Sequence, residues 1–230
     1  MDIHGSLRQI PSLASVPEVE VAILATVATR RRLARGEVLF SEGEAPAGFH
    51  LVEAGWLKGV RTAHDGRELV QTVFGLHDLI GTCPGPRTVY PYDCTVRAMT
   101  QASVLSACGL AVTNVLRQCP ALLDVVQDGF YTGKRRCVEL TVDLALQDID
   151  RRLAQLLLRL ARRYPTVDAE GRMEVPSAMS QREMAAAIGT AREVVTRHVA
   201  SLVGRGILMR KGRRILLAKP GELSALVETL

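Results

Sequence analysis

A glycine-centred turn between two helical patterns near the C-terminus is the feature that most constrains this fold. Ser180 and Glu183 form the capping-box pattern, in which a serine caps a helix and a glutamate three residues later reaches back to it. Small and apolar residues follow as an inner face up to Ile188, and Gly189 stands where a helix ends in a positive φ. A second helical pattern starts directly after this glycine. The segment therefore predicts a helix-turn-helix.

The second helix is predicted to begin near Thr190. Val195, Val199 and Leu202 recur at steps of four and three, so they are expected to face inward. The opposite face carries residues that are polar or small: Arg192, Glu193, Thr196, Arg197 and Ala200. Arginine offers a fork to guanine O6 and N7, and glutamate accepts from cytosine N4, so this face suits base edges in a major groove. The alternative is structural, with Glu193 completing a second capping box on Thr190.

A short basic hairpin is predicted to follow this helix. Strand-like stretches at 206–210 and 213–217 flank Lys211-Gly212. The basic side chains of the hairpin are expected to hold phosphates and to set register without reading sequence. These side chains are Arg210, Lys211, Arg213 and Arg214.

Positive charge gathers in this part of the chain. Between Ser180 and Ile215 lie eight arginines and lysines and two glutamates, a net charge of +6, whereas the whole chain carries +5. A basic stretch on an otherwise balanced protein indicates a phosphate-backbone partner. The plainer alternative is a solvated charged face, which charge runs most often form.

The first part of the chain, to about residue 118, is predicted to be β. Short glycine-punctuated stretches alternate with turns, and Asp65-Gly66 lies between the strand-like stretches 56–62 and 68–74. Asp-Gly in this setting is a strong signal for a two-residue hairpin turn with positive φ at both positions. Regular turns at this spacing favour a small barrel or sandwich.

Residues 119–146 predict one long helix with an apolar seam. Pro120 suits the first turn of a helix. Apolar or small residues then follow alternating steps of three and four, as in a two-helix coiled coil. The predicted dimer seam is Leu123, Val126, Phe130, Gly133, Cys137, Leu140 and Leu144. The alternative is a helix packed on its own barrel, and both hold if different faces are used.

Composition indicates a globular chain of the cytosol. The sequence is 47% hydrophobic and 23% charged, and no apolar run approaches the roughly 18 residues that span a membrane. The N-terminus lacks the basic-then-apolar pattern of a signal peptide. Five cysteines, an odd number without an evident disulfide framework, fit a reducing compartment. We therefore expect a cytoplasmic protein with no membrane partner.

Together these motifs resemble the CRP/FNR superfamily, which comprises the cyclic-AMP receptor and the fumarate-nitrate regulators of bacteria. The segment from Ser180 to Ile207, with the hairpin after it, is similar to the winged helix-turn-helix of that family. The stretches RGEVLFSEGE, HDLIG and TVRAMT resemble its cyclic-nucleotide-binding-type β-roll, and the long helix takes the place of its dimer helix. The resemblance implies an α+β fold with a β-roll sensor over 1–118, a dimerisation helix over 119–146 and a winged helix-turn-helix over 147–230.

The resemblance also implies a DNA-binding transcription regulator and not an enzyme. A symmetric homodimer would read an inverted-repeat operator in double-stranded DNA, with half-sites of TGTGA-like sequence and RNA polymerase as a further partner. The base-reading residues carried over are Arg192, Glu193, Thr196 and Arg197. Thr190 would join the basic hairpin as a phosphate contact. Ala191 replaces the serine common in the family, which puts one phosphate contact in doubt.

The sensor part departs from the cyclic-nucleotide members of the family. Their phosphate-binding cassette carries Gly-Glu and then Arg-Ser, whereas the matching positions here are Gly81-Thr82 and Tyr92-Asp93. The ribose acceptor and the counter-charge of the phosphate are both lost, so cyclic AMP is not the expected ligand. The iron–sulfur branch of the family uses several N-terminal cysteines, and none precedes Cys83, so an iron–sulfur cluster is not expected either.

Three hypotheses for the signal stay open. The first is a small molecule between β-roll and long helix, in a pocket formed by Phe74, Thr82, Cys83, Tyr92, Cys94, Phe130 and Cys137. The second is haem or a metal held by His77, Cys83 and Cys94, because His and Cys are competent ligands. The third is thiol chemistry, either of Cys137 across the two-fold axis or between Cys83 and Cys94. The plain alternative makes each cysteine a small buried hydrophobe.

Rival functions are weaker but distinguishable. An enzyme would use Cys83 as a nucleophile with His77 and Asp78, yet that spacing matches no known motif and leaves the basic segment unexplained. A constitutive regulator with a degenerate sensor domain would bind its operator equally in every ligand state. A non-DNA interaction module would lack the steep salt dependence that phosphate neutralisation imposes.

Overall fold

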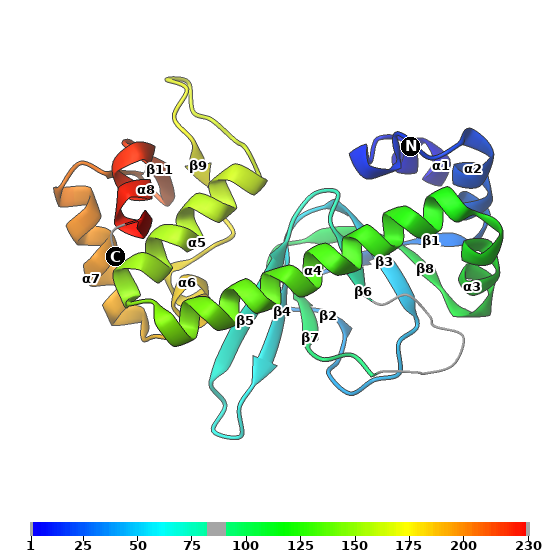
Figure 1. Cartoon of the computed structure of the whole chain (residues 1–230), viewed down its shortest axis with the longest axis horizontal. Coiled ribbons are helices and arrows are strands. Elements are labelled where there is room, and N and C mark those ends of the chain that lie inside the picture. Colours follow the sequence, from blue (N-terminus) through cyan, green and yellow to red (C-terminus); the bar gives the residue numbers. More distant parts are fainter. Residues whose placement is uncertain (1, 82–90, 229–230) are drawn as a thin grey trace. The chain divides into compact units, whose positions relative to one another are not determined.

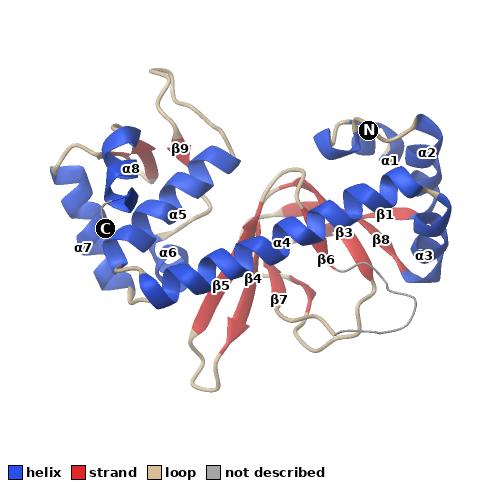
Figure 2. Cartoon of the chain, in the orientation of Figure 1, coloured by secondary structure: helices blue, strands red, loops and turns tan. Residues whose placement is uncertain are grey.

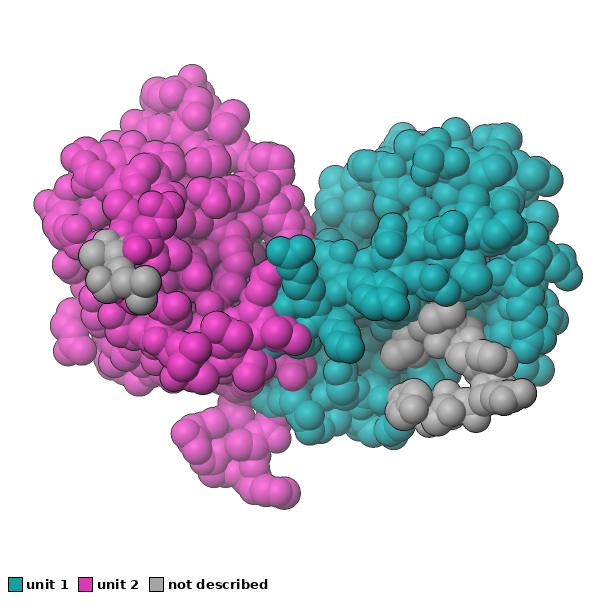
Figure 3. Space-filling model, in the orientation of Figure 1, with its two compact units in different colours: residues 1–61, 72–137 teal, residues 62–71, 138–230 magenta. Residues whose placement is uncertain are grey.

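Strands gather in the N-terminal part of the chain, and helices make up most of the C-terminal part (Figure 1, Figure 2). The computed structural model describes residues 2–81 and 91–228. The chain divides into two compact units, one of residues 1–61 and 72–137 and one of residues 62–71 and 138–230 (Figure 3). Thr82 and Cys83, both expected in the effector pocket, lie outside the described residues.

Two four-stranded sheets form a β-roll among the described residues. One sheet has the strand order β1-β8-β3-β6 and the other β2-β7-β4-β5. The strands are β1 (Ala28–Leu33), β2 (Val38–Phe40), β3 (Gly48–Ala54), β4 (Leu57–Thr62), β5 (Glu68–Phe74), β6 (Leu79–Gly81), β7 (Thr95–Ala98) and β8 (Ala102–Cys108). Leu33, Val52, Leu57 and Val104 are fully buried in one core cluster that joins the two sheets. The β architecture predicted for this part is confirmed.

Helices at both ends of this part were not evident in the sequence pattern. The helices α1 (Ile3–Arg8), η1 (Pro11–Leu13) and α2 (Glu18–Val27) precede β1, and α3 (Gly109–Gln118) follows β8. Leu7, Val21 and Leu24 are fully buried in a second core cluster, together with Phe49 and Leu105 of the sheet. The prediction of β structure throughout 1–118 is therefore wrong at its ends. Short helices owe their stability to such apolar packing more than to their own propensity.

The hairpin turn at Asp65-Gly66 is wider than the sequence predicts. Ala63 N–H donates to the Arg67 carbonyl at 2.8 Å, and Gly66 N–H donates to the Ala63 carbonyl at 2.9 Å, which leaves a three-residue loop. Gly66 has a φ of +83°, but Asp65 is not among the described residues with positive φ. Asp65 instead accepts the Arg67 N–H through its carboxylate at 3.0 Å. The prediction of a two-residue turn with positive φ at both Asp65 and Gly66 is therefore wrong.

The long helix predicted at Pro120 is present as α4 (Pro120–Leu146). Leu122 and Val126 are each 1% exposed and belong to the second core cluster. The prediction that Val126 belongs to a dimer seam is therefore wrong, because residues of its own chain already cover the side chain. Leu123 and Phe130 pack against the same core cluster.

The second half of α4 exposes a different apolar stripe. Val138, Val142 and Leu146 follow each other at steps of four and are 55%, 44% and 76% exposed. This stripe is offset from the predicted seam. The remaining seam residues are all partly buried: Gly133, Cys137, Leu140 and Leu144.

Helices surround a small three-stranded sheet in the C-terminal part. The sheet has the order β10-β11-β9, with β9 (Glu174–Val175), β10 (Leu208–Lys211) and β11 (Arg214–Leu217). Helix α5 (Ile149–Arg163) buries Leu153 and Leu157 completely and packs against α8 (Pro220–Glu228), a helix that the sequence pattern did not predict. Among the described residues, no helix combines the length and the apolar character needed to cross a bilayer.

Candidate nucleic-acid interface

Gly189 makes the turn between α6 (Gln181–Ala187) and α7 (Arg192–Gly204). Its φ is +65°, in the left-handed region that favours glycine. Ser180 caps α6 as predicted, since Glu183 N–H donates to Ser180 Oγ at 3.2 Å, and the Ser180 hydroxyl also contacts the Glu183 carboxylate. The reciprocal bond of a full capping box is not formed, because the Ser180 N–H donates to the Ala178 carbonyl at 3.1 Å. Thr190 N–H donates to the Ala185 carbonyl at 3.0 Å, and this bond closes the turn.

Two side chains from outside the helix pair hold this turn. Arg152 on α5 donates through Nη1 to the Ile188 carbonyl at 2.7 Å, so a carbonyl at the end of α6 has a partner. A Cβ placed on Gly189 would lie 2.9 Å from Leu144 Cδ2 on α4. Leu144, expected in the dimer seam, thus packs on the turn of its own chain. The turn is fixed by backbone geometry and by two neighbouring helices.

Helix α7 buries one face and exposes the other. Val195, Val199 and Leu202 are at most 3% exposed, which confirms the predicted inner face. The predicted base-reading residues are all exposed: Arg192, Glu193, Thr196 and Arg197. The Thr196 hydroxyl lies 2.8 Å from Gln181 Oε1 on α6 and 2.9 Å from the Arg192 carbonyl oxygen on α7. Thr196 therefore links the two helices.

The start of α7 decides between the two interpretations of Glu193. The N-cap residue is Ala191, and no side chain caps the helix there. The alternative in which Thr190 and Glu193 form a capping box is therefore wrong. Glu193 lies exposed in the first turn, where a negative side chain also favours the helix dipole.

His198 belongs to this region although the sequence pattern did not single it out. Its Nδ1 lies 2.5 Å from Asp150 Oδ1 at the start of α5, and its side chain is 23% exposed. The contact ties the middle of α7 to a third helix. The partners are 48 residues apart in sequence, so no local pattern announces them.

The basic hairpin is displaced by one residue from its predicted position. Lys211 pairs with Arg214 at the ends of β10 and β11, so Gly212 and Arg213 form the turn. The φ of Gly212 is +61°, which suits the first central position of a type II′ turn. The placement of Lys211 in the turn is therefore wrong, because the strand register makes it the last residue of β10.

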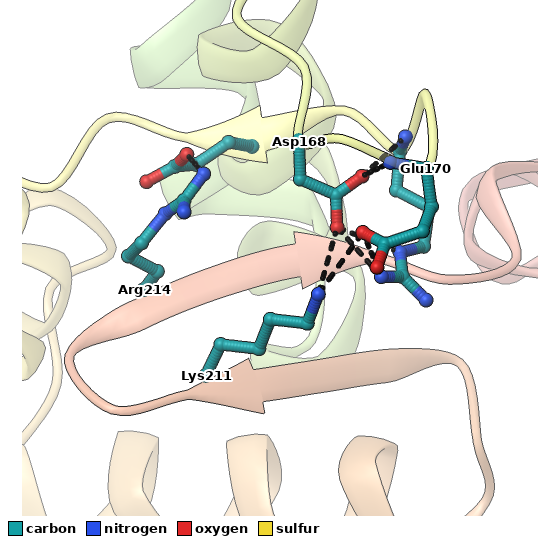
Figure 4. A network of polar contacts seen from close by, with 6 residues as sticks. Asp168, Glu170, Lys211 and Arg214 are labelled. Atoms are coloured by element: carbon teal, nitrogen blue, oxygen red, sulfur yellow. Dashed lines mark hydrogen bonds and ion pairs between the residues drawn. The ribbon is translucent and has the colours of Figure 1, made fainter.

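The predicted phosphate contacts of this hairpin fall into two pairs. Arg210 and Arg213 are exposed. Lys211 contacts the carboxylates of Asp168 and Glu170, and Arg214 contacts that of Glu174 (Figure 4). Thr190, the fifth predicted contact, is partly buried at the turn. The four cations of the hairpin thus differ in their surroundings, because Lys211 and Arg214 contact carboxylates of the same chain.

Three of the residues expected to line an effector pocket fill the β-roll core instead. Phe74, Tyr92 and Cys94 are at most 9% exposed. The Tyr92 ring stacks on Phe40 with centroids 3.7 Å apart, and its hydroxyl accepts the Ala47 N–H at 3.1 Å. The interior beside Cys94 is also tightly packed, because a Cβ on Gly59 would lie 3.2 Å from the Cys94 sulfur.

The described cysteines are poorly suited to thiolate chemistry. Burial raises the pKa of the Cys94 thiol to about 12, and the negative charge of Asp93 adds to the effect. Burial also raises the pKa of Cys137 above its usual value. Within residues 2–81 and 91–228, no cluster of three or more His, Cys, Asp or Glu side chains could hold a metal ion. The predicted metal site of His77, Cys83 and Cys94 stays a prediction, because Cys83 lies outside the described residues.

A cavity of about 340 Å³ lies elsewhere in the same unit. His77, on the loop before β6, has a φ of +69° and lines this cavity beside Asp78. Helix α4 contributes Asp128 and Arg136 to the wall. The cavity therefore presents charges of both signs and one imidazole.

Both parts of the chain match described families. Residues 30–119 match the family described as "Cyclic nucleotide-binding domain". Residues 151–226 match the family described as "Crp-like helix-turn-helix domain", which covers the turn at Gly189 and the basic hairpin. The order of the two matches is the order of the β-roll and the helix-turn-helix described above.

Relatives and solved structures are similar over most of their length. The chain is 28% identical over 194 residues to the "CRP-like cAMP-activated global transcriptional regulator" of Mycobacterium tuberculosis, which covers 83% of this chain and 84% of the relative. It is 22% identical over 207 residues to the "Anaerobic regulatory protein" of Bacillus subtilis, with 90% and 87% covered. The structure of FixK2 from Bradyrhizobium japonicum has the same fold, with a TM-score of 0.78 at 22% identity over 89% of this chain and 99% of that chain.

We expect Gly189→Ala to lower the free energy of unfolding by about 1–2 kcal/mol, because a residue with a Cβ is strained in the left-handed region. The new Cβ would also press on Leu144. Gly204→Ala is the matched control, since a Cβ there meets nothing within 4 Å and the residue ends the same helix. Urea unfolding followed by circular dichroism compares the two variants. Equal stability of both would contradict the role given to Gly189.

Proposed function

Because the chain belongs to the CRP/FNR superfamily of DNA-binding transcription regulators, we propose that it acts as a homodimer that reads an inverted-repeat operator with α7. The signal that controls it is an effector other than cyclic AMP. RNA polymerase is the further partner that transcription regulation implies. The single observation that carries this proposal is the exposed face of α7, with two arginines and a glutamate above a fully buried inner face.

The geometry of α7 favours insertion into the major groove. Arg192 and Arg197 stand five residues apart on the exposed side, with Glu193 between them. The positive segment 180–215 surrounds this face with a net charge of +6. Guanidinium forks recognise guanine edges, and a carboxylate accepts from cytosine N4, so the face offers donors and an acceptor for base pairs. Its charge supplies the attraction to the phosphate backbone.

We expect Arg192→Ala to cost about 1–3 kcal/mol on the preferred operator and to relax sequence preference at one base pair of each half-site. Arg213→Ala is the matched control, because an arginine at the hairpin tip should weaken binding to all sequences about equally. Selection of bound sequences from a randomised duplex pool, followed by affinity measurements, separates the two effects. An Arg192→Ala protein with unchanged base preference would remove this residue from the reading face.

The exposed stripe on the second half of α4 supports dimerisation. Val138, Val142 and Leu146 offer apolar surface to solvent along one line of the helix. Val138 and Val142 also line a groove of about 450 Å³ with Leu158 of α5. Contiguous exposed apolar surface of this kind is typical of an interaction site. We propose the equivalent stripe of a second copy as its partner.

A charge in this stripe should separate the dimer. Val142→Lys is expected to raise the dimer dissociation constant roughly tenfold or more, since burying an unpaired ammonium group is costly. Val167→Lys is the control, because Val167 is a similarly exposed valine, at 58%, outside α4. Sedimentation velocity over a concentration series measures both. If the two variants dimerise equally well, this stripe is not the interface.

The contents of the β-roll argue against cyclic AMP as the effector. Tyr92 stands where the cyclic-nucleotide members carry an arginine, and its ring is stacked on Phe40 in the core. A phosphate there would meet an aromatic ring and the nearby Asp93 in place of a guanidinium group. We propose instead that a small polar molecule binds the cavity lined by His77, Asp128 and Arg136.

A second candidate function is a constitutive regulator, and the filled core around Tyr92 and Cys94 favours it. Such a protein would bind DNA equally in every ligand state. Haem held by His77 is the alternative for the cavity. It would supply a gas-binding iron there, but Cys94 lies in the core and is no second ligand.

We expect cyclic AMP to leave both the melting temperature and the operator affinity unchanged, because the counter-charge for its phosphate is missing. Freshly purified protein should show no Soret absorption. Thermal melting, fluorescence anisotropy with labelled operator and an absorption spectrum test these expectations together. A cyclic-AMP-dependent rise in affinity, or a Soret band, would contradict the proposed class of effector.

A further inference from the structure

Three carboxylates, one on β9 and two on the loop before it, contact two basic side chains of the wing, the hairpin of β10 and β11 (Figure 4). Glu170 Oε2 lies 3.0 Å from Lys211 Nζ, and Asp168 Oδ2 lies 3.4 Å from the same nitrogen. Glu174 forms an ion pair with Arg214 in the neighbouring part of the sheet. Two of the four wing cations therefore already have anionic partners within the chain.

These carboxylates are held in place by the backbone of a second hairpin, residues 166–174. Asp168 N–H donates to the Arg172 carbonyl at 3.0 Å, and Glu174 N–H donates to the Thr166 carbonyl at 2.8 Å. The antiparallel pairing of β9 with β11 sets Glu174 opposite Leu216. The hairpin 166–174 is thus joined to the wing sheet, and its acidic groups are in position before any ligand arrives.

Asp168 is the centre of the cluster. Its side chain is 3% exposed, and its carboxylate accepts from the backbone N–H of Arg172 at 2.9 Å and from Arg172 Nη2 at 2.6 Å. Burial would raise the pKa of Asp168, but the hydrogen bonds from Arg172 outweigh burial and hold it below its usual range. The group is therefore anionic at neutral pH. A buried anion that loses one cationic partner is left with less compensation for its burial.

We propose that the hairpin 166–174 holds Lys211 and Arg214 away from DNA, so that Arg210 and Arg213 make the phosphate contacts of the wing. The inference rests on the proposed DNA-reading function and assigns positioning residues to it. Lys211 would leave two carboxylates to reach a phosphate, one of them nearly buried. Arg213, at the tip of the turn, is exposed.

The consequence is a limit on sequence-independent affinity. Each neutralised phosphate adds about 0.9 to the slope of the logarithm of affinity against the logarithm of salt concentration. Two sequestered cations in each subunit keep this non-specific term small. The three ion pairs also tie the wing to the hairpin 166–174, so Arg213 is presented from a braced turn. Specific contacts by α7 then form a larger share of the total affinity.

The test compares salt slopes on a random-sequence duplex for the full-length protein. Arg213→Ala should lower the magnitude of the slope by about 0.9 per bound subunit, because one phosphate contact is lost. Lys211→Ala should leave the slope unchanged. Glu170→Gln should increase it and should raise non-specific affinity at low salt, because Lys211 then loses its closer partner. Circular dichroism melting of each variant confirms that the proteins compared are folded.

Glu222→Gln is the matched control for the loss of one negative charge. Glu222 on α8 is 51% exposed and pairs with Lys219 at 2.7 Å, much as the 55%-exposed Glu170 pairs with Lys211. This control should leave the slope unchanged. A Lys211→Ala slope that falls as far as that of Arg213→Ala would overturn the sequestration while leaving DNA binding intact. A wild-type protein without any salt slope would overturn the DNA-reading function and the inference with it.

Discussion

The orientation of the exposed face of α7 depends on one backbone constraint, the left-handed turn at Gly189. Its φ of +65° changes the chain direction between α6 and α7 within a few residues. Leu144 packs on the turn, and Arg152 donates to the carbonyl of Ile188, the C-cap residue of α6. Because the inner face of α7 is almost completely buried, the orientation of the helix follows from this packing. The backbone of α7 is then already ordered before binding, so that mainly the exposed side chains lose conformational freedom in a complex.

The long helix α4 contributes to both units by means of different residues. Near its start, Leu122 and Val126 are core residues of the β-roll unit. Near its end, Leu144 touches the Gly189 turn and Leu146 is exposed. One continuous helix therefore carries core residues of the β-roll unit near its start and a residue that packs on the Gly189 turn near its end.

The basic side chains of the wing differ in whether they contact carboxylates of the same chain. The sequence predicts phosphate contacts simply from the cations of a short segment. In the structure, the strand register and the hairpin 166–174 give two of these cations carboxylate partners. Lys211 and Arg214 contact carboxylates, although their side chains are 42% and 43% exposed. Arg210 and Arg213 are exposed as well, but no carboxylate contact is described for them. Net charge by itself therefore does not tell how many of the wing cations already have carboxylate partners.

Local sequence signals predicted the helix-turn-helix well. The Ser180 N-cap, the turn at Gly189 and the buried stripe of Val195 and Val199 are all present, because each depends on residues fewer than ten positions apart. The sequence did not predict contacts between residues that are distant in the chain. Lys211 contacts Glu170 at a separation of 41 residues, and His198 contacts Asp150 at a separation of 48.

Errors of one or two residues have equally physical causes. The predicted position of the wing turn is wrong by one residue, because Gly212 takes the positive φ at the first central position of the turn. The predicted turn at Asp65-Gly66 is wrong because Asp65 does not adopt a positive φ, and its carboxylate instead accepts the Arg67 N–H. Seven-residue periodicity on α4 could not tell a dimer seam from a face packed on its own core, because both are apolar. Val126 belongs to the second kind.

Methylation interference on the preferred operator tests the central claim most directly, because a methyl group on guanine N7 blocks only a protein that reads the major groove at that base. The account predicts interference at guanines in two major-groove segments about 10 base pairs apart, one for each copy of α7. Binding that tolerates N7 methylation throughout the operator, or interference confined to the minor-groove side, would contradict it.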